Sequence, residues 1–305
     1  MAPAPDHLPA GWTDVVPLGE GAFGRVYRAV DQAGRPVAVK VLAPSLAADP
    51  DAAWRFAAEY RLLGRFDHPG LPRARGEGRT EDGSPFFAMD LVSGAEPASG
   101  DPTAVRAVMA GVAEVLKHLH ARGFVHGDLK PENVRVTDDG AVRVLDVGLV
   151  APVGGRREGI AGTPAFMAPE VLRKGPVAPG ADLYALGVLG YVLRAGRAPF
   201  GGGPAEIVRG HLAEAPPALR AAVADPELDG LITGLLAKDA AARPSAAAVL
   251  ALLAGEPVPP EAPGLAGGGF VGRGDVLDAW RHVLGGLEAA VLGVPTELPG
   301  ALWVT

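Results

Sequence analysis

One short stretch holds most of the side chains suited to chemistry: His126-Gly127-Asp128-Leu129-Lys130-Pro131-Glu132-Asn133. A carboxylate at Asp128 can orient an incoming hydroxyl group and accept its proton. The cation at Lys130 can neutralise charge on a transferring phosphoryl group, and the amide oxygen of Asn133 can ligate Mg²⁺. These residue types are rare, because the chain has five lysines against 23 arginines, and Asn133 is its one asparagine. The cluster therefore predicts a phosphoryl-transfer site.

A second oxygen ligand follows the cluster, in Asp146-Val147-Gly148. The apolar segment Val142–Leu145 before it predicts a short strand that ends at this carboxylate. Because Mg²⁺ prefers oxygen ligands, Asn133 and Asp146 together are candidates for holding a metal ion.

The segment Gly19-Glu20-Gly21-Ala22-Phe23-Gly24-Arg25-Val26 is rich in glycine. Such a pattern also opens dinucleotide-binding domains, and an ordinary glycine hairpin is a further alternative. Here it lies between two predicted strands and no helix follows Gly24. We therefore interpret it as a turn whose backbone N–H groups can approach phosphates, with Phe23 at the tip.

Lys40 ends the predicted strand Val37-Ala38-Val39-Lys40. A lysine buried on a strand needs a partner, and Glu59 on the following helix is a natural one. Such a pair places a cation over the α- and β-phosphates of a nucleotide. The alternative is that Lys40 extends to solvent along its aliphatic stem.

The elements that must position these residues fall into two groups. Alternating apolar residues predict strands at Val15–Leu18, Arg25–Val30, Pro36–Leu42 and Phe86–Val92. Asp49 as N-cap and Pro50 predict a helix that runs to about Phe66. Helical patterns follow at residues 103–122, 180–195, 205–212, 226–236 and 245–254. A strand-rich first third and a helical remainder predict an α+β, bilobal fold: a small antiparallel sheet with one helix, then a larger helical lobe.

The predicted domain organisation has four parts. Residues 1–11 are a flexible N-terminus, and residues 12–255 form one domain with lobes at 12–92 and 93–255. Residues 256–269 are a Pro/Gly-rich linker, and 270–305 form a C-terminal segment.

Composition excludes several classes of function. The net charge of −7 argues against general nucleic-acid binding, and the absence of cysteine excludes disulfides and thiolate chemistry. The apolar stretch Leu183–Leu193 is too short to span a bilayer. With no targeting segment evident, we expect a cytoplasmic protein without a membrane span.

These residues, taken together, resemble the eukaryotic-type protein kinase superfamily in its bacterial Ser/Thr branch. The resemblance extends to Ala168-Pro169-Glu170, to Asp182-Leu183-Tyr184-Ala185-Leu186-Gly187 and to Arg243 before Pro244, so it covers most of the chain. It implies ATP and Mg²⁺ as cofactors and protein Ser/Thr hydroxyls as substrates.

The resemblance also implies roles for individual residues. Asp128 would be the catalytic base, assisted by Lys130, while Lys40 would bind the α/β-phosphates and be held by Glu59. Asn133 and Asp146 would ligate Mg²⁺. The nucleotide would be bound by Gly19, Glu20, Gly21, Ala22, Phe23, Gly24, Val26, Ala38, Lys40, Met89, Asp90, Val92 and Arg135.

Three further residues take supporting roles by the same resemblance. Thr163, in the substrate-facing stretch, would mark Ser/Thr specificity together with Lys130. Glu170 and Arg243 would form a buried ion pair, and Asp182 would brace the catalytic loop.

The sequence departs from the family pattern at Gly127, where the family has an arginine that pairs with an activation-loop phosphate. The loop between Asp146 and Glu170 contains no Ser or Tyr, and its only Thr is Thr163. The arginine that would bind a loop phosphate and the Ser or Tyr residues that would carry it are absent together. We therefore expect activity without phosphorylation of the loop.

Other departures affect packing and the nucleotide site. Val147 replaces a Phe and Ala74 a larger residue in a stack with Leu63 and His126, which either thins this stack or is refilled by neighbours. Arg135 replaces an apolar residue under the adenine, where its stem can pack, its guanidinium can stack, or nucleotide affinity can fall.

The C-terminal segment resembles the opening of P-loop ATPase modules, from Phe270–Leu277 to the apolar end Ala301–Thr305, but no GxxxxGK[ST] follows. A short amphipathic helix at Asp275–Leu287 is the alternative. Two rival functions stay open: a pseudokinase scaffold gated by nucleotide, and a stand-alone ATPase module, which the missing phosphate loop disfavours.

Overall fold

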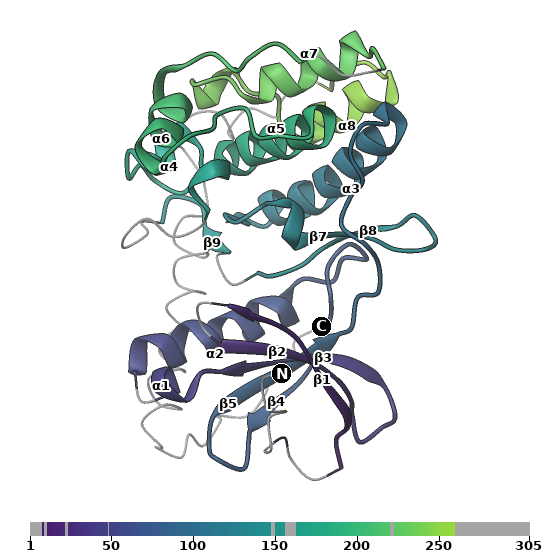
Figure 1. The fold of residues 1–305 in the computed structure, drawn as a ribbon, viewed down its shortest axis with the longest axis vertical. Coiled ribbons are helices and arrows are strands. Elements are labelled where there is room, and N and C mark those ends of the chain that lie inside the picture. Colours follow the sequence, from purple (N-terminus) through teal and green to yellow (C-terminus); the bar gives the residue numbers. More distant parts are fainter. Residues whose placement is uncertain are drawn as a thin grey trace, which may run out of the picture.

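The computed structural model describes residues 8, 11–21, 24–47, 49–147, 150–155, 163–219 and 223–259 of the 305-residue chain. These residues form two lobes, a sheet-based lobe and a helical lobe (Figure 1). The predicted α+β, bilobal fold is therefore confirmed. The predicted C-terminal segment 270–305 lies outside the described residues, as do Ala22, Phe23 and Gly148.

The first lobe is a five-stranded antiparallel sheet with strand order β1-β2-β3-β5-β4. Its elements are β1 (Thr13–Gly21), β2 (Gly24–Val30), β3 (Pro36–Leu42), α1 (Pro44–Ala47), α2 (Pro50–Arg65), β4 (Ala74–Arg79) and β5 (Pro85–Asp90). The predicted strand Phe86–Val92 ends earlier, at Asp90, because the chain then leaves the sheet for the second lobe.

Register divides this sheet into two faces. Lys40 pairs with Val26 on one side and with Phe87 on the other, and Ala38 pairs with Met89. Directly paired residues project from the same face, so this face carries the residues predicted to bind a nucleotide. The opposite face is a separate core of Ala29, Val37, Val39, Phe86 and Ala88.

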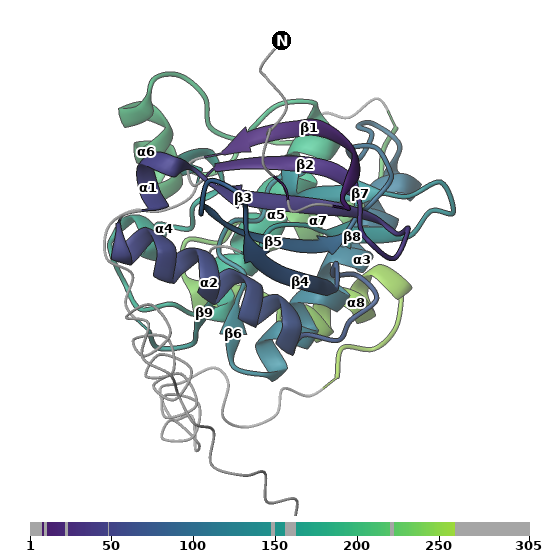
Figure 2. The same ribbon diagram turned by 90° about the horizontal axis from the view of Figure 1, so that it is seen from below.

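Helix α2 lies beside the sheet (Figure 2) and packs against both lobes. Its start is as predicted, since the Asp49 carboxylate accepts a hydrogen bond from the Ala52 N–H and Pro50 is the first helical residue. Phe56 packs on Phe87 of the sheet, with ring centroids 4.9 Å apart. Leu63 and Phe66, near the other end, belong to the core of the second lobe. The helix that carries Glu59 is thus held from both sides.

The second lobe is mainly helical (Figure 1). Its elements are α3 (Pro102–Ala121), β6 (Phe124–Val125), η1 (Pro131–Asn133), β7 (Val134–Val136), β8 (Val142–Val144), β9 (Ala151–Pro152), η2 (Pro164–Phe166), α4 (Pro169–Leu172), α5 (Pro179–Ala195), α6 (Pro204–Ala213), α7 (Pro226–Leu235), η3 (Ala240–Ala242) and α8 (Ala246–Ala254). The long predicted helices agree with these bounds to within two residues. Among the described residues, no helix is both long and apolar enough to cross a membrane.

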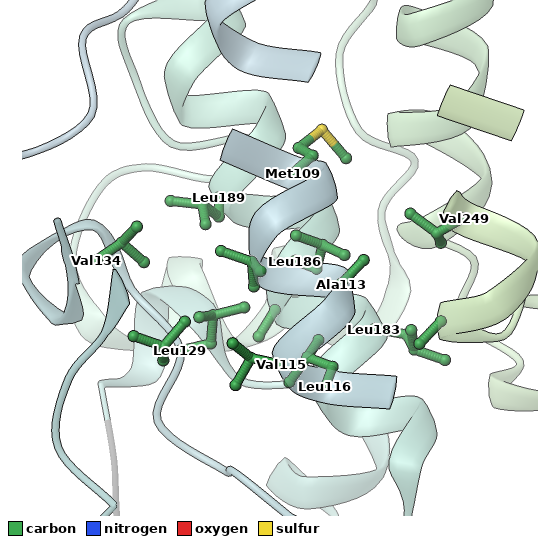
Figure 3. Close-up of a cluster of buried hydrophobic side chains, with 14 of the residues drawn as sticks. Met109, Ala113, Val115, Leu116, Leu129, Val134, Leu183, Leu186, Leu189 and Val249 are labelled. Atoms are coloured by element: carbon green, nitrogen blue, oxygen red, sulfur yellow. The ribbon is translucent and has the colours of Figure 1, made fainter. Parts of the chain in front are cut away.

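The core of this lobe lies between α3, α5 and α8 (Figure 3). Met109, Leu186 and Val249 are fully buried there. Helix α5 comes close to its neighbours because Gly190 has no side chain: a Cβ at this position would lie 2.8 Å from the Met109 sulfur. This packing fixes α5, which carries Asp182 beneath the catalytic loop.

Candidate active site

The loop that carries Asp128 runs from β6 to η1 and is fixed from below by Asp182 of α5. The Asp182 carboxylate accepts 2.8 Å hydrogen bonds from the backbone N–H groups of His126 and Gly127. His120 Nε2 on α3 lies 2.8 Å from the same carboxylate. Burial alone would raise the pKa of Asp182, but the hydrogen bond and charge of His120 and the loop contacts hold it below its usual value.

Gly127 adopts a φ of +81°, a backbone conformation that strains residues with a side chain. In this conformation the backbone N–H groups of His126 and of Gly127 itself both point at the Asp182 carboxylate. Glycine thus allows this sharp turn without strain, and the turn presents the next residue, Asp128.

Asp128 is the centre of a polar cluster. Its carboxylate lies 2.9 Å from Lys130 Nζ and accepts a 3.3 Å hydrogen bond from the Thr163 N–H. Lys130 Nζ also donates to the Thr163 hydroxyl at 3.2 Å. The structure therefore brings Thr163, more than 30 residues along the chain, to Asp128 and Lys130 and so joins the activation segment to the loop.

Asn133 is oriented by the same loop. Its Nδ2 donates to the Asp128 backbone carbonyl at 2.8 Å, so its amide oxygen faces away from this carbonyl. The Asn133 backbone carbonyl accepts a 2.7 Å hydrogen bond from the N–H of Leu145. Because Asp146 is the next residue, this bond holds the two candidate metal ligands near each other. Asp146 has a φ of +57° and a side chain that is 43% exposed.

The predicted ion pair between Lys40 and Glu59 is present. Lys40 Nζ lies 2.7 and 2.8 Å from the two Glu59 oxygens and 3.7 Å from Asp146. Burial opposes the charge of Lys40, but the carboxylates of Glu59 and Asp146 outweigh it and raise its pKa. Burial raises the pKa of Glu59 to about 7, although Lys40 acts in the opposite direction.

The glycine-rich segment forms the hairpin of β1 and β2, in which Gly21 pairs with Gly24. Since β2 rather than a helix follows, the structure contradicts the dinucleotide-binding alternative. Gly24 has no room for a side chain, because a Cβ would lie 2.0 Å from the Val41 carbonyl oxygen. Gly19 and Glu20 lie on β1, and Glu20 contacts Arg25 on β2 at 3.6 Å.

The remaining predicted nucleotide-binding residues divide between the sheet and the second lobe. Val26, Ala38 and Met89 share the sheet face of Lys40. The Asp90 carboxylate, at the end of β5, pairs with Arg75, and Val92 follows on the segment between the lobes. Arg135 lies on β7, where its guanidinium is turned towards backbone carbonyls and Glu96 rather than standing alone.

The predicted pair of Glu170 and Arg243 is also present, with nitrogen–oxygen distances of 2.6 and 2.9 Å. Of the four residues of the predicted stack, Leu63, His126 and Val147 are at most 3% exposed, whereas Ala74 is half-buried. The hydrophobic core therefore accommodates Val147 where the family has an aromatic residue.

Sequence reasoning missed His120. Its position on a helix, two residues from His118, gave no sign of a partner, because Asp182 lies 62 positions further along the chain. Only the packing of α3 against α5 brings the two side chains together. Among the described residues, no cluster of three or more His, Cys, Asp or Glu side chains could hold a metal ion.

The chain matches known proteins over most of its length. A family model described as the protein kinase domain matches residues 12–252. The chain is 38% identical over 273 residues to the DNA damage-responsive serine/threonine-protein kinase RqkA of Deinococcus radiodurans, covering 83% of this chain and 40% of that protein.

Two other curated relatives give similar values. Serine/threonine-protein kinase PkaA of Streptomyces coelicolor is 37% identical over 261 residues, covering 75% of this chain and 47% of that protein. Serine/threonine-protein kinase PknL of Mycobacterium tuberculosis is 35% identical over 242 residues, covering 74% and 60%. The chain thus spans between 40% and 60% of the length of these three relatives.

Proposed function

The chain belongs to the protein kinase family, with a kinase domain of the Ser/Thr type, and from this premise we propose that it transfers the γ-phosphoryl group of ATP to Ser and Thr hydroxyls of proteins. One observation carries the proposal: the Asp128 carboxylate is held by Lys130 and by the Thr163 N–H beside an intact Lys40–Glu59 pair. A nucleotide-gated scaffold would use the Lys40–Glu59 pair but would have no need of the contacts that hold Asp128.

Each side chain has a defined task in this proposal. Asp128 orients the substrate hydroxyl and accepts its proton, while Lys130 lies close enough to offset charge on the transferring group. Glu59 holds Lys40, which binds the α- and β-phosphates. Most of the rate enhancement then comes from positioning and charge stabilisation.

The donor set at Asn133 and Asp146 fits Mg²⁺. Asn133 directs its amide nitrogen to the Asp128 carbonyl, which leaves an oxygen for a hard cation, and the Asp146 carboxylate is partly exposed. Two protein oxygens are typical for Mg²⁺, which completes its shell with water and phosphate oxygens. When bound, the ion would neutralise charge on the phosphates.

Incubation of the chain with ATP, Mg²⁺ and a generic basic protein tests the proposal, with Asp128→Asn as the matched variant. We expect phosphate incorporation by the natural chain and a loss of at least about 10²-fold in the variant, the range for a removed general base. Equal background signals, with nucleotide still bound by both, would favour the pseudokinase scaffold instead.

We also propose that activity needs no phosphorylation of the activation loop. Gly127 cannot receive a loop phosphate, and no Ser or Tyr lies between Asp146 and Glu170. The Asp128–Thr163 contact, which fastens the activation segment to the catalytic loop, involves neither feature.

Phosphatase treatment followed by an activity assay and mass spectrometry tests this point. We expect the treated chain to keep its rate to within about twofold, a change of about 0.4 kcal/mol in activation free energy. The reason is that the Asp128–Thr163 contact involves no phosphate. A loss of activity that accompanies removal of a phosphate mapped to the loop would contradict the proposal.

A further inference from the structure

Arg135 is the residue at which the nucleotide-site prediction and the structure differ most. Its side chain is 25% exposed, yet the guanidinium has several acceptors. Nη1 donates to the backbone carbonyls of Glu132 at 3.0 Å and Val134 at 2.9 Å. Nη2 lies 3.8 Å from the Glu96 carboxylate. The charged end is therefore turned to the chain itself, and only the aliphatic stem is left to face a nucleotide.

The two carbonyls that Arg135 holds belong to the residues on either side of Asn133. Two backbone hydrogen bonds fix Asn133 further. Its N–H donates to the Lys130 carbonyl at 3.0 Å, and its carbonyl accepts from the Leu145 N–H at 2.7 Å. Leu145 immediately precedes Asp146. One guanidinium thus stabilises the short stretch of backbone from which both candidate Mg²⁺ ligands are positioned.

On its other side, Arg135 faces the segment that follows the connection between the lobes. Ala95 and Val136 exchange backbone hydrogen bonds of 3.0 and 2.9 Å. Gly94 allows this close approach, because a Cβ there would lie 2.5 Å from the Val136 carbonyl oxygen. Glu96, one residue beyond Ala95, is therefore delivered to Arg135 by a clamped backbone.

We propose that Arg135 is a positioning residue. Through Glu96, it ties the segment that follows the connection between the lobes to the backbone on both sides of Asn133. Its guanidinium acts on the metal ligands through the peptide groups and does not bind the nucleotide. An arginine suits this task because its planar fork donates in several directions at once, which an apolar residue cannot do. This inference rests on the proposed kinase function, since it assigns Asn133 to the metal.

The test uses Arg135→Leu in the full chain, which keeps an apolar body but removes the guanidinium. The matched control is Arg143→Leu, because Arg143 lies opposite Arg135 in the strand register, and among the described residues no hydrogen bond or ion pair joins it to Glu132 or Glu96. Arg135→Lys, the milder second variant, keeps a charge but lacks the fork.

The first readout needs neither ATP nor metal: hydrogen exchange at the Asn133 and Leu145 amides. We expect Arg135→Leu to speed exchange at both amides by about tenfold or more, Arg135→Lys to do so less, and the control to leave them unchanged. Unchanged exchange in both Arg135 variants would overturn the proposal. Because this readout involves no catalysis, it stays informative even if the chain proves to be a scaffold.

The second readout separates metal from nucleotide. We expect Arg135→Leu to raise the Mg²⁺ concentration for half-maximal ADP binding by about tenfold, the range for outer partners of metal ligands, and to leave Mg²⁺-free ADP affinity within about twofold. If Mg²⁺-free affinity falls by as much as the Mg²⁺-dependent affinity, Arg135 binds the nucleotide directly and the proposal is wrong.

Discussion

Two pairs of a cation and a carboxylate, Lys40–Glu59 in the first lobe and Arg243–Glu170 in the second, differ in how completely the protein supplies their partners. In the second lobe, Arg243 is fully buried and bonds both Glu170 oxygens. Its remaining donors reach the carbonyls of Gly180, Ala237 and Lys238. The protein alone satisfies this guanidinium.

The pair in the first lobe is less complete. Lys40 is 13% exposed, bonds Glu59, and has a second carboxylate, Asp146, at 3.7 Å. Two carboxylates against one ammonium leave negative charge at this point, and Asp146 is partly open to solvent. A site of this kind can accept a metal ion and phosphates, whereas the Arg243 site has nothing left to bind.

The same type of ion pair can therefore serve structure or chemistry, depending on whether protein groups satisfy all the hydrogen-bond donors of its cation. A pair with every donor used is costly to break, because the remaining charge stays buried. A pair beside a third titratable group can adjust by moving a proton.

Arg243→Ala should lower the free energy of unfolding by about 3–5 kcal/mol, because it leaves the partly buried Glu170 carboxylate and three backbone carbonyls without their donor. Urea unfolding followed by circular dichroism measures this. The control is Arg209→Ala, which breaks an exposed pair with Glu214 at 2.8 Å. A loss for Arg243→Ala that matches the control would contradict a structural role.

Lys40→Met should cost less, about 1–3 kcal/mol, the range for a buried acceptor that loses its donor. Glu59 can become neutral, since burial already raises its pKa to about 7. The same urea titration measures the loss, and phosphotransfer should be abolished while the fold remains. A destabilisation equal to that of Arg243→Ala under the same conditions would mean that the two pairs do not differ.

The cost of Lys40→Met should depend on pH. A carboxyl group whose pKa is higher in the folded chain binds more protons there, so its contribution to stability is lost as the pH rises from about 4.5 to 7. Lys40 lowers the pKa of Glu59, so removing Lys40 extends this window upwards.

We therefore expect Lys40→Met to be more destabilised relative to the natural chain at about pH 8.5 than at about pH 6, with a slope of at most about 1.4 kcal/mol per pH unit. Unfolding titrations at several pH values measure this. The double variant with Glu59→Gln should lose the extra slope, and a slope that persists in it would assign the effect to another group.

The smallest effect is expected at the exposed pair of the glycine hairpin. Arg25 and Glu20 lie 3.6 Å apart with side chains 46% and 69% exposed. Because solvent screens such a pair, Glu20→Gln should change the free energy of unfolding by less than about 0.5 kcal/mol. A change above about 1 kcal/mol in the urea titration would show that solvent exposure does not decide how much an ion pair contributes to stability in this chain.

Much of the fold and of the candidate site follows from local sequence. Asp49-Pro50 begins α2 because a carboxylate cap and a preset proline φ act within one turn. The spacing of Asp128, Lys130 and Asn133 places their chemistry on one loop whatever surrounds it. These features depend on residues within a few positions of each other, so the sequence is enough to predict them.

Tertiary structure decided the partners of the long or buried side chains. His120 meets Asp182 only because α3 packs on α5, and Arg135 turns from the nucleotide side to Glu96 and two carbonyls that the fold places within reach. The two carbonyls are local, one and three residues before Arg135, but Glu96 reaches it only because the fold brings the segment between the lobes against β7. The chemical groups of the site can therefore be predicted from local sequence, whereas the distant partners of these groups depend on how the helices and the two lobes pack.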